Sequence, residues 1–139
     1  MRALERCVLT GDVAVMGNKI LLVEDNADFQ EIFGRMAAHL GFEVICAGNG
    51  LEGIRKATAE KPDVVVVDLV LTGTGGMDGI ETIRRLKRDR TTQKIPIIVC
   101  TALIDELSES AALRAGAAEY LRKPVGVSAL ESTLRRYLT

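Results

Sequence analysis

The sequence predicts an α/β fold built on a five-stranded, doubly wound parallel sheet. Short apolar segments alternate with amphipathic segments five times between residues 19 and 138, which is the pattern of strand–helix units. The third apolar segment holds four consecutive valines, as expected for a strand that is covered on both faces. With 139 residues, of which 47% are hydrophobic and 27% charged, the chain has the size and composition of one globular domain.

The first strand–helix unit is expected from residue 19 to residue 41. The segment "KILLV", residues 19–23, is the strand, and residues 27–40 have the periodicity of a helix. One face of that helix is expected to carry five apolar side chains: Phe29, Ile32, Phe33, Met36 and Leu40. Gly41 follows at the position where a glycine commonly ends a helix.

The second and third strands flank a helix with clear signals at both ends. "FEVICA", residues 42–47, is the second strand. Asn49 is a favourable N-cap with Glu52 three residues later, as in a capping box, and Pro62 stops the helix. "DVVVVD", residues 63–68, is the third strand.

The second half of the chain repeats the pattern. Three further helices are expected at residues 79–89, 105–116 and 127–138, and two further strands at residues 95–102 and 118–124. Pro96 is tolerable only at the start of its strand, and Gly116 ends the fourth helix. The apolar residues expected to face the core are Ile80, Ile83 and Leu86 in the third helix and Val127, Leu130, Leu134 and Leu138 in the fifth.

Composition excludes several classes of function. The formal net charge is −1 and the chain has no Trp, so we expect neither direct nucleic-acid binding nor attraction to a membrane surface. Cys7, Cys46 and Cys100 follow no metal-ligand spacing, and we expect reduced thiols in a cytoplasmic protein.

The first residues stand apart from this pattern. Residues 1–16 lack the long apolar region of a signal peptide, and no segment of the chain approaches the length needed to span a membrane. We interpret residues 1–16 as an N-terminal extension, either disordered or added by an upstream start codon, and residues 17–139 as the domain. The sequence assigns no function to the extension.

Chemically active side chains follow four of the five strands. The first strand ends in Glu24 and Asp25, the third in Asp68, the fourth in Thr101, and Lys123 follows the fifth. In a doubly wound sheet the ligand site lies beyond the carboxyl ends of the strands, so these groups should share one edge. Three neighbouring carboxylates repel one another and favour a hard cation such as Mg²⁺, and a carboxylate can itself accept a phosphoryl group.

The motifs at these strand ends resemble the receiver domains of two-component response regulators. "ILLVEDN", "VVVVDL", "GMDGIE", "PIIVCTA" and "YLRKP" occur in that family's order and separations over roughly residues 19–138. The resemblance implies a flavodoxin-like or CheY-like (βα)5 fold with strand order 2-1-3-4-5.

The resemblance also implies a role for each acid at the sheet edge. Asp68 corresponds to the phosphoacceptor. Asp25 would bind Mg²⁺ directly and Glu24 mainly through water, and the main-chain carbonyl of Val70 would complete the protein ligands.

The remaining implied roles concern switching and charge neutralisation. Thr101 would be the switch hydroxyl that follows the phosphoryl group, and Tyr120 the aromatic switch residue whose ring turns inward on activation. Lys123 would pair with the phosphoryl oxygens, and the Lys123–Pro124 peptide bond is expected to be cis.

The resemblance implies partners as well. The donor would be a phosphohistidine on a histidine kinase or a histidine phosphotransfer protein, and the acyl phosphate would then be hydrolysed. The chain would act as a signalling phosphoacceptor and not as an enzyme. It would signal through the surface of the fourth helix, fifth strand and fifth helix to a downstream protein that the sequence does not identify. A homodimer through that surface is also compatible with the family, as is excision from a larger protein.

One loop departs from the family pattern. The usual stretch from the acceptor to "MDG" is shorter by three residues and has a proline where this chain has Thr72, and "TGTGG", residues 72–76, lengthens the loop. A pseudo-receiver that takes no phosphate is therefore the alternative function. An FMN site would need a phosphate loop after the first strand, and an aspartyl-phosphate phosphatase would need an acid at Val70, so neither class fits.

Three further features carry expectations: one histidine, one basic run and two apolar positions near the site. His39, near the end of the first helix, is expected to be a surface residue and not a phosphocarrier, and the basic run "RRLKRDR" is expected to be the solvated face of the third helix. Val70 and Leu103 are apolar at the positions beside the acceptor and the switch hydroxyl. We hypothesise that without a polar group to orient water the phosphorylated state is long-lived.

Overall fold

The computed structural model describes residues 18–71 and 77–138 and contains five strands and five helices in strict alternation. The element order is β1 (Lys19–Val23), α1 (Ala27–His39), β2 (Glu43–Ala47), α2 (Gly50–Glu60), β3 (Val64–Val67), α3 (Gly79–Arg88), β4 (Ile97–Thr101), α4 (Glu106–Ala115), β5 (Glu119–Arg122) and α5 (Val127–Tyr137). All neighbouring strands are parallel, in the order β2-β1-β3-β4-β5. The predicted fold class and strand order are confirmed.

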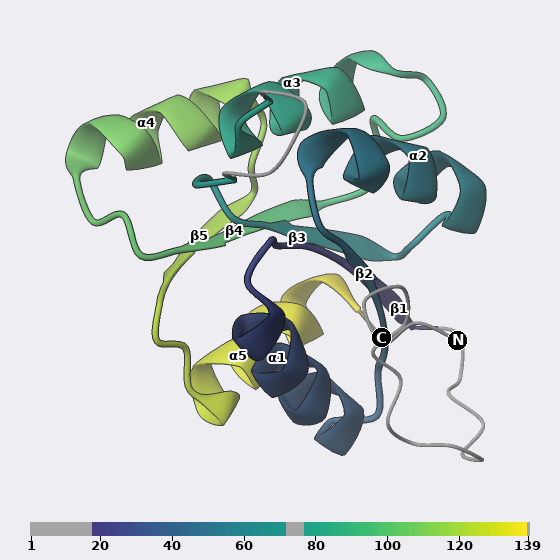
Figure 1. Cartoon of the computed structure of the whole chain (residues 1–139), viewed down its shortest axis with the longest axis vertical. Helices are drawn as coiled ribbons and strands as arrows, with labels where there is room; N and C mark the ends of the chain where they lie inside the picture. Colours follow the sequence, from purple (N-terminus) through teal and green to yellow (C-terminus); the bar gives the residue numbers. More distant parts are fainter. Residues whose placement is uncertain (1–17, 72–76, 139) are drawn as a thin grey trace.

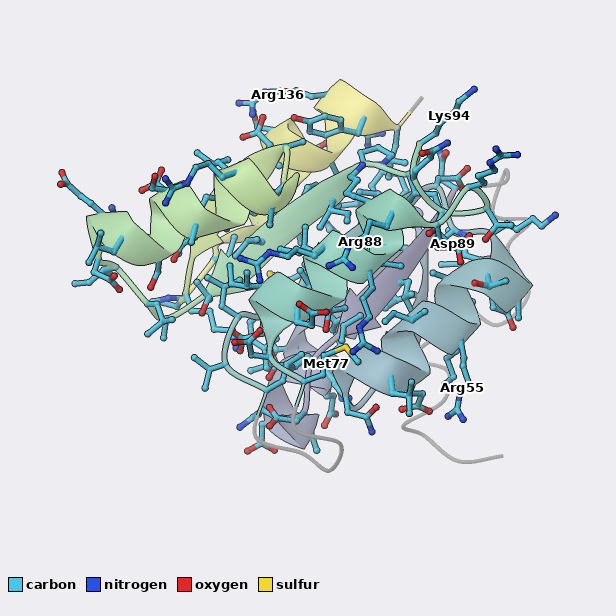
Figure 2. All side chains as sticks on the ribbon, turned by 90° about the horizontal axis from the view of Figure 1, so that it is seen from above. Arg55, Met77, Arg88, Asp89, Lys94 and Arg136 are labelled. Atoms are coloured by element: carbon cyan, nitrogen blue, oxygen red, sulfur yellow. The ribbon has the colours of Figure 1, made fainter. Side chains whose placement is uncertain are left out.

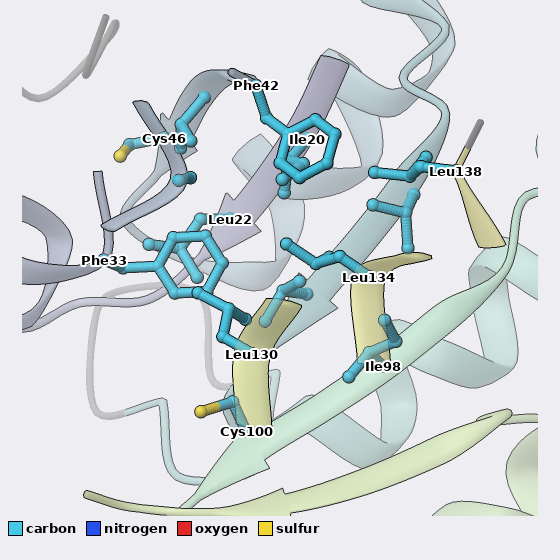
Figure 3. Packing of buried hydrophobic residues seen from close by; sticks show 14 residues of the cluster. Ile20, Leu22, Phe33, Phe42, Cys46, Ile98, Cys100, Leu130, Leu134 and Leu138 are labelled. Carbon is cyan, nitrogen blue, oxygen red and sulfur yellow. The ribbon is translucent and has the colours of Figure 1, made fainter. Parts of the chain in front are cut away.

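The sheet is the middle of three layers. Helices α1 and α5 cover one face, and α2, α3 and α4 cover the other (Figure 1). Alternate residues along each strand face opposite layers, so the four valines of β3 divide between two hydrophobic cores. Val64 and Val66 pack with Phe33 of α1 and Leu134 of α5 in the core shown in Figure 3. All four valines are completely buried, as predicted for a strand covered on both faces.

Two residues predicted to face the core lie on the surface. Ile32 is 54% exposed, because the buried stripe of α1 runs through Gln30, Phe33 and Ala37, on the opposite side of the helix. Val127 is 42% exposed, because it is the first residue of α5 and the buried stripe begins at Leu130, one turn later.

The helix ends follow the predicted signals. The Asn49 side chain accepts the N–H of Glu52, while the Glu52 carboxylate accepts the N–H of Gly48, one residue before the cap. Gly41, after α1, and Gly116, after α4, have positive φ angles of 94° and 124°, which favour glycine. Asn49 thus begins α2 just after the carboxyl end of β2, and the two glycines end α1 and α4.

The two described cysteines differ. Cys100 is a free thiol buried in β4, and burial raises its pKa to about 12. Cys46 is buried in β2 and is disulfide-bonded, so the prediction of reduced thiols does not hold for it. Cys7, like the N-terminal extension and residues 72–76, lies outside the described residues.

The surface predictions can be read from the same structure. His39 is exposed, as predicted. Arg84, Arg85 and Arg88 are exposed on α3 and approach the Glu81 carboxylate; Arg88 is labelled in Figure 2. The arginines of α3 in the basic run thus lie on its solvated face, while Leu86 of the same run is buried. Within residues 18–71 and 77–138 no helix has the length and apolar character to cross a membrane.

Candidate functional site

The candidate site is at the carboxyl edge of the sheet, where backbone hydrogen bonds hold all four polar strand ends. The N–H of Glu24 donates to the carbonyl of Ala47 (2.9 Å), and the N–H of Asp68 donates to the carbonyl of Val23 (3.1 Å). The N–H of Lys123 donates to the carbonyl of Thr101 (2.9 Å), so β5 delivers the lysine beside the end of β4. The ladder therefore continues one residue beyond the strands and fixes the main chain of these residues.

Lys123 joins two of the predicted acids. Its Nζ donates to Oε1 of Glu24 at 2.7 Å and to Oδ2 of Asp68 at 2.9 Å, across 99 and 55 residues of chain. Glu24 is 1% exposed and Asp68 is 6% exposed, so this ammonium is the cation that makes burial of the two carboxylates tolerable. The Lys123–Pro124 peptide bond is cis, as predicted.

Both carboxylate oxygens of Asp68 have donors. Oδ1 accepts the main-chain N–H of Val70 at 3.1 Å, while Oδ2 accepts from Lys123. On the other side Gly79, the first residue of α3, packs against the Asp68 main chain: a Cβ there would collide with the Asp68 carbonyl oxygen and lie 2.6 Å from Cα of Leu69. The N–H of Gly79 donates to the Leu69 carbonyl at 3.1 Å. Two hydrogen bonds therefore hold the carboxylate of Asp68, and the close approach of Gly79 holds its main chain.

Glu24 is fixed by the loop that follows it. Its Oε2 accepts the N–H of Asn26 at 3.0 Å, and its main-chain carbonyl accepts Nε2 of Gln30 at 2.6 Å. Burial raises the pKa of Glu24, while the hydrogen bonds from Lys123 and Asn26 oppose the rise and the charge of Asp68 adds to it. The net effect is a pKa above the ordinary value, which indicates a carboxylate that benefits from a nearby cation.

The pKa of Lys123 is also shifted by the site. Burial lowers the pKa of Lys123, but its hydrogen bonds to Glu24 and Asp68 outweigh burial, and the net pKa is raised. Lys123 is therefore charged throughout the physiological range. A fixed positive charge at this position can neutralise oxygen atoms that approach Asp68.

The predicted magnesium site is partly assembled. Within residues 18–71 and 77–138, no three His, Cys, Asp or Glu side chains lie close enough together to hold a metal ion. Glu24 and Asp68 meet at Lys123, and Asp25 is half-buried next to Glu24 in the loop. The chemistry of the donors fits a hard divalent cation, because buried carboxylates provide oxygen ligands only. The Asp25 carboxylate and the Val70 carbonyl remain predicted ligands.

Thr101 and Tyr120 are linked through Leu103. Oγ1 of Thr101, which is completely buried, accepts the N–H of Leu103 at 3.4 Å, and the hydroxyl of Tyr120 donates to the Leu103 carbonyl at 2.9 Å. Tyr120 is half-buried against the core shared with α2, α3 and α4. Burial raises the pKa of Tyr120, and the charges of Asp105 and Glu109 add to the rise, so the phenol stays a donor.

Some residues of the site were not predicted. Asn26, Phe29 and Gln30 all lie in or just before the first turns of α1 and contact Glu24 or Lys123; the ring centroid of Phe29 is 4.2 Å from Nζ of Lys123. Asn26 could have been recognised as an N-cap from its position before the amphipathic run, and its side chain does accept the N–H of Phe29. Phe29 and Gln30 carry no local signal, because their partners are distant in sequence or are main-chain atoms.

Comparisons with known proteins agree with this arrangement. The family described as "Response regulator receiver domain" matches residues 20–135. The chain is 35% identical over 120 residues to Protein PilH of Pseudomonas aeruginosa, covering 86% of this chain and 97% of PilH. It is 36% identical over 126 residues to the phosphate regulon transcriptional regulatory protein PhoB of the same organism, covering 88% of this chain and 54% of PhoB. The chain thus spans about half the length of the second relative.

A solved structure matches closely in backbone. The receiver domain of a sensor histidine kinase from Pseudomonas aeruginosa, described with a magnesium ion coordinated in its active site cleft, superposes with a TM-score of 0.79. The two are 30% identical, and the match covers 87% of this chain and 97% of that chain.

Proposed function

Since the chain belongs to the response regulator receiver domain family, we propose that it is a phosphorylatable receiver of a two-component or phosphorelay system, with Asp68 as the phosphoacceptor. The observation that carries the proposal is the set of contacts around Asp68. Its two oxygens are oriented by the Val70 N–H and the Lys123 ammonium, on a strand whose other side chains are all buried. We assign residues 17–139 to the receiver.

The reaction follows from this geometry. A carboxylate oxygen of Asp68 attacks the phosphorus of a phosphohistidine donor; the new P–O bond forms as the P–N bond breaks, and the electron pair leaves with the imidazole, which takes up a proton. Hydrolysis reverses the modification, because water attacks the phosphorus and the carboxylate leaves. Lys123 neutralises the phosphoryl oxygens while its second carboxylate partner, Glu24, keeps the ammonium in place.

A divalent cation completes the charge balance. Glu24, Asp25, Asp68 and the carbonyl of Val70 are the groups that would hold Mg²⁺. Its chemistry, when bound, is to neutralise the phosphoryl oxygens that Lys123 does not reach. The raised pKa of Glu24 supports this assignment, because the buried carboxylates have one ammonium between them.

Signalling would start at Thr101. If its hydroxyl turns to the phosphoryl group, the bond to the Leu103 N–H is lost, and Leu103 can move with the Tyr120 hydroxyl that binds its carbonyl. Tyr120 lies in β5, between α4 and α5, so the change would reach the surface formed by α4, β5 and α5. That surface is our proposed site for the downstream protein and for a homodimer.

The partners follow from the family. The donor is a histidine kinase or a histidine phosphotransfer protein, and the chain acts in the cytoplasm as a signalling phosphoacceptor and not as an enzyme. Its similarity both to nearly the whole of PilH and to half of PhoB is compatible with a stand-alone regulator and with one module of a larger protein.

Intact mass tests the proposal. The protein and its Asp68→Asn variant are incubated with Mg²⁺ and acetyl phosphate, and separately with a phosphorylated histidine phosphotransfer protein. One added phosphoryl group in the wild-type protein and none in the variant is the expected result. Beryllofluoride titration followed by NMR is the second measurement, because it needs no donor.

A protein that gains no mass from either donor and binds no beryllofluoride would contradict the proposal. The pseudo-receiver, an interaction module that takes no phosphate, would then be the better description. Unchanged mass with acetyl phosphate alone would not contradict the proposal, because the second donor and the beryllofluoride titration test the site independently.

A further inference from the structure

We propose that Phe29 is a positioning residue for Lys123: its ring face holds the ammonium in the site with and without a phosphoryl group. The inference rests on the proposed function, since it assigns a further residue to the same site. The family resemblance assigns no role to this position, and the proposal is carried by contacts of this chain alone.

The contact is direct. Nζ of Lys123 lies 4.2 Å from the centroid of the Phe29 ring, well inside the range of a cation–π interaction. An ammonium has three N–H groups, and those of Lys123 have two carboxylate acceptors, Glu24 and Asp68. The ring face is the third contact, so the ammonium is enclosed by two anions and one aromatic face.

The ring is itself held from two sides. The N–H of Phe29 donates to Oδ1 of Asn26 at 2.8 Å, and the N–H of Asn26 donates to Glu24 at 3.0 Å, so the N-cap of α1 ties Phe29 to the acid that Lys123 binds. On the helix Phe29 packs on Phe33, with ring centroids 6.0 Å apart. Phe33 is completely buried and anchors the pair in the core.

The lysine needs such a support. It follows the last strand, its side chain is 19% exposed, and four rotatable bonds separate its anchored main chain from Nζ. The charge on Asp68 changes when the phosphoryl group is added, so the ion pair between Lys123 and Asp68 is remade in every cycle. The ring carries no charge that changes, and it therefore keeps Nζ in place in both states.

The competing explanation is that Phe29 only fills the core. Phe29 is half-buried and packs against the same hydrophobic cluster as Phe33, so its loss would lower stability in either case. Phe42 separates the explanations, because it is buried in the same cluster at 3% exposure and has no contact with Phe29 or Lys123 among the described interactions.

Three variants form the test. Phe29→Leu keeps an apolar side chain but removes the ring, Phe29→Tyr keeps a ring, and Phe42→Leu is the matched control for lost packing. The probes are beryllofluoride with Mg²⁺, titrated by calorimetry, and the ring-current shifts of the Lys123 side-chain protons, recorded by NMR without ligand. Urea unfolding of each variant reports stability separately.

We expect Phe29→Leu to weaken beryllofluoride binding by at most about thirtyfold, the upper limit of one cation–π contact, because the ammonium must then be ordered when the ligand binds. The upfield shift of the Lys123 side-chain protons should disappear with it. Phe29→Tyr should keep both readouts, and Phe42→Leu should lose stability while keeping its affinity.

Unchanged or tighter beryllofluoride binding in Phe29→Leu would overturn the inference, as would an equal loss in Phe42→Leu. If the wild-type protein bound no beryllofluoride and gained no mass from either donor, the proposed function would fail, and the ring-current shifts would still decide whether the ring positions Lys123.

Discussion

The two halves of the site are built with different numbers of contacts. At the ends of β1 and β3, Glu24, Asp68 and Lys123 share short hydrogen bonds, and Asn26, Gln30 and Val70 add further donors. At the end of β4, the hydroxyl of Thr101 has one hydrogen bond among the described residues, a long one of 3.4 Å from the Leu103 N–H. Ile104 in the following loop and Leu107 in the first turn of α4 are 68% and 80% exposed.

This difference matches two tasks. An acceptor carboxylate and its lysine must be held in one geometry for phosphoryl transfer. A switch must have a second arrangement of similar free energy. A loop whose bond to the switch hydroxyl is long, whose other bond is to the Tyr120 hydroxyl and whose Ile104 side chain is exposed costs little to move. We infer that the β1–β3 half is the rigid half of the site and the β4 half is the movable one.

Removing the lysine should break the rigid half with the largest effect. In Lys123→Met the two buried carboxylates lose their shared cation, so we expect phosphorylation by acetyl phosphate to slow by roughly a hundredfold or more. Time courses of intact mass provide the rate. A rate within threefold of the wild type would show that this ammonium is not needed near the phosphoryl group.

The same variant should have a pH signature in its stability. The pKa of Glu24 is already raised by burial, and loss of the Lys123 hydrogen bond would raise it further. Between the ordinary carboxyl pKa and the raised one, the folded state binds more protons than the unfolded state, so its stability increases as pH falls through the raised pKa. The stability deficit of Lys123→Met should therefore be largest near pH 8 and shrink toward pH 5. Urea unfolding at both pH values measures it, and a deficit independent of pH would contradict the assignment to Glu24.

A methyl group at Gly79 should damage the rigid half through the backbone. A Cβ there meets the carbonyl oxygen of Asp68 and Cα of Leu69, so we expect Gly79→Ala to lower the free energy of unfolding by roughly 1–3 kcal/mol. Gly48→Ala is the control, because its Cβ would make an ordinary contact of 3.7 Å and should change stability by less than about 0.5 kcal/mol. Equal effects in urea unfolding would mean that the close approach at Asp68 is easily relieved.

Polar groups beside the acceptor should shorten the phosphorylated state. Val70 is 44% exposed and Leu103 half-buried, and neither can orient an attacking water. Val70→Asn combined with Leu103→Gln should accelerate dephosphorylation on the order of tenfold, because a positioned polar group can orient water. Decay of the phosphorylated mass after removal of the donor is the measurement. A half-life that is unaltered or longer would count against the hypothesis of a long-lived phosphorylated state.

The smallest effect is expected in the movable half. Tyr120→Phe removes one hydrogen bond, to the Leu103 carbonyl, and should cost less than about 1 kcal/mol of stability with no change in phosphorylation rate. NMR shifts of residues 102–104 with and without beryllofluoride should nevertheless differ from those of the wild type. Identical shifts in both states would mean that Leu103 does not couple Thr101 to Tyr120.

Much of this molecule could be predicted from local patterns. Four valines before Asp68 predict a strand buried on both faces, and Asn49 and Gly116 predict helix ends, because caps and periodicities depend on neighbours in the chain. The rule that ligands bind beyond the carboxyl ends of parallel strands then predicts that Glu24, Asp68 and Lys123 share an edge, and two hydrogen bonds confirm it.

Other features were decided only by the tertiary structure. Ile32 and Val127 fit a helical stripe, but which side of a helix is buried depends on how it lies on the sheet, and both are exposed. Folding also brought the Phe29 ring to Lys123 and the Tyr120 hydroxyl to the Leu103 carbonyl, since these partners are distant in sequence. The Gln30 amide binds a main-chain atom, the Glu24 carbonyl, which any residue could supply. The sequence by itself determined which groups reach the edge, because the periodicity that marks the end of each strand is local. The pairing of these groups was decided by packing, because side-chain contacts between distant elements leave no local pattern.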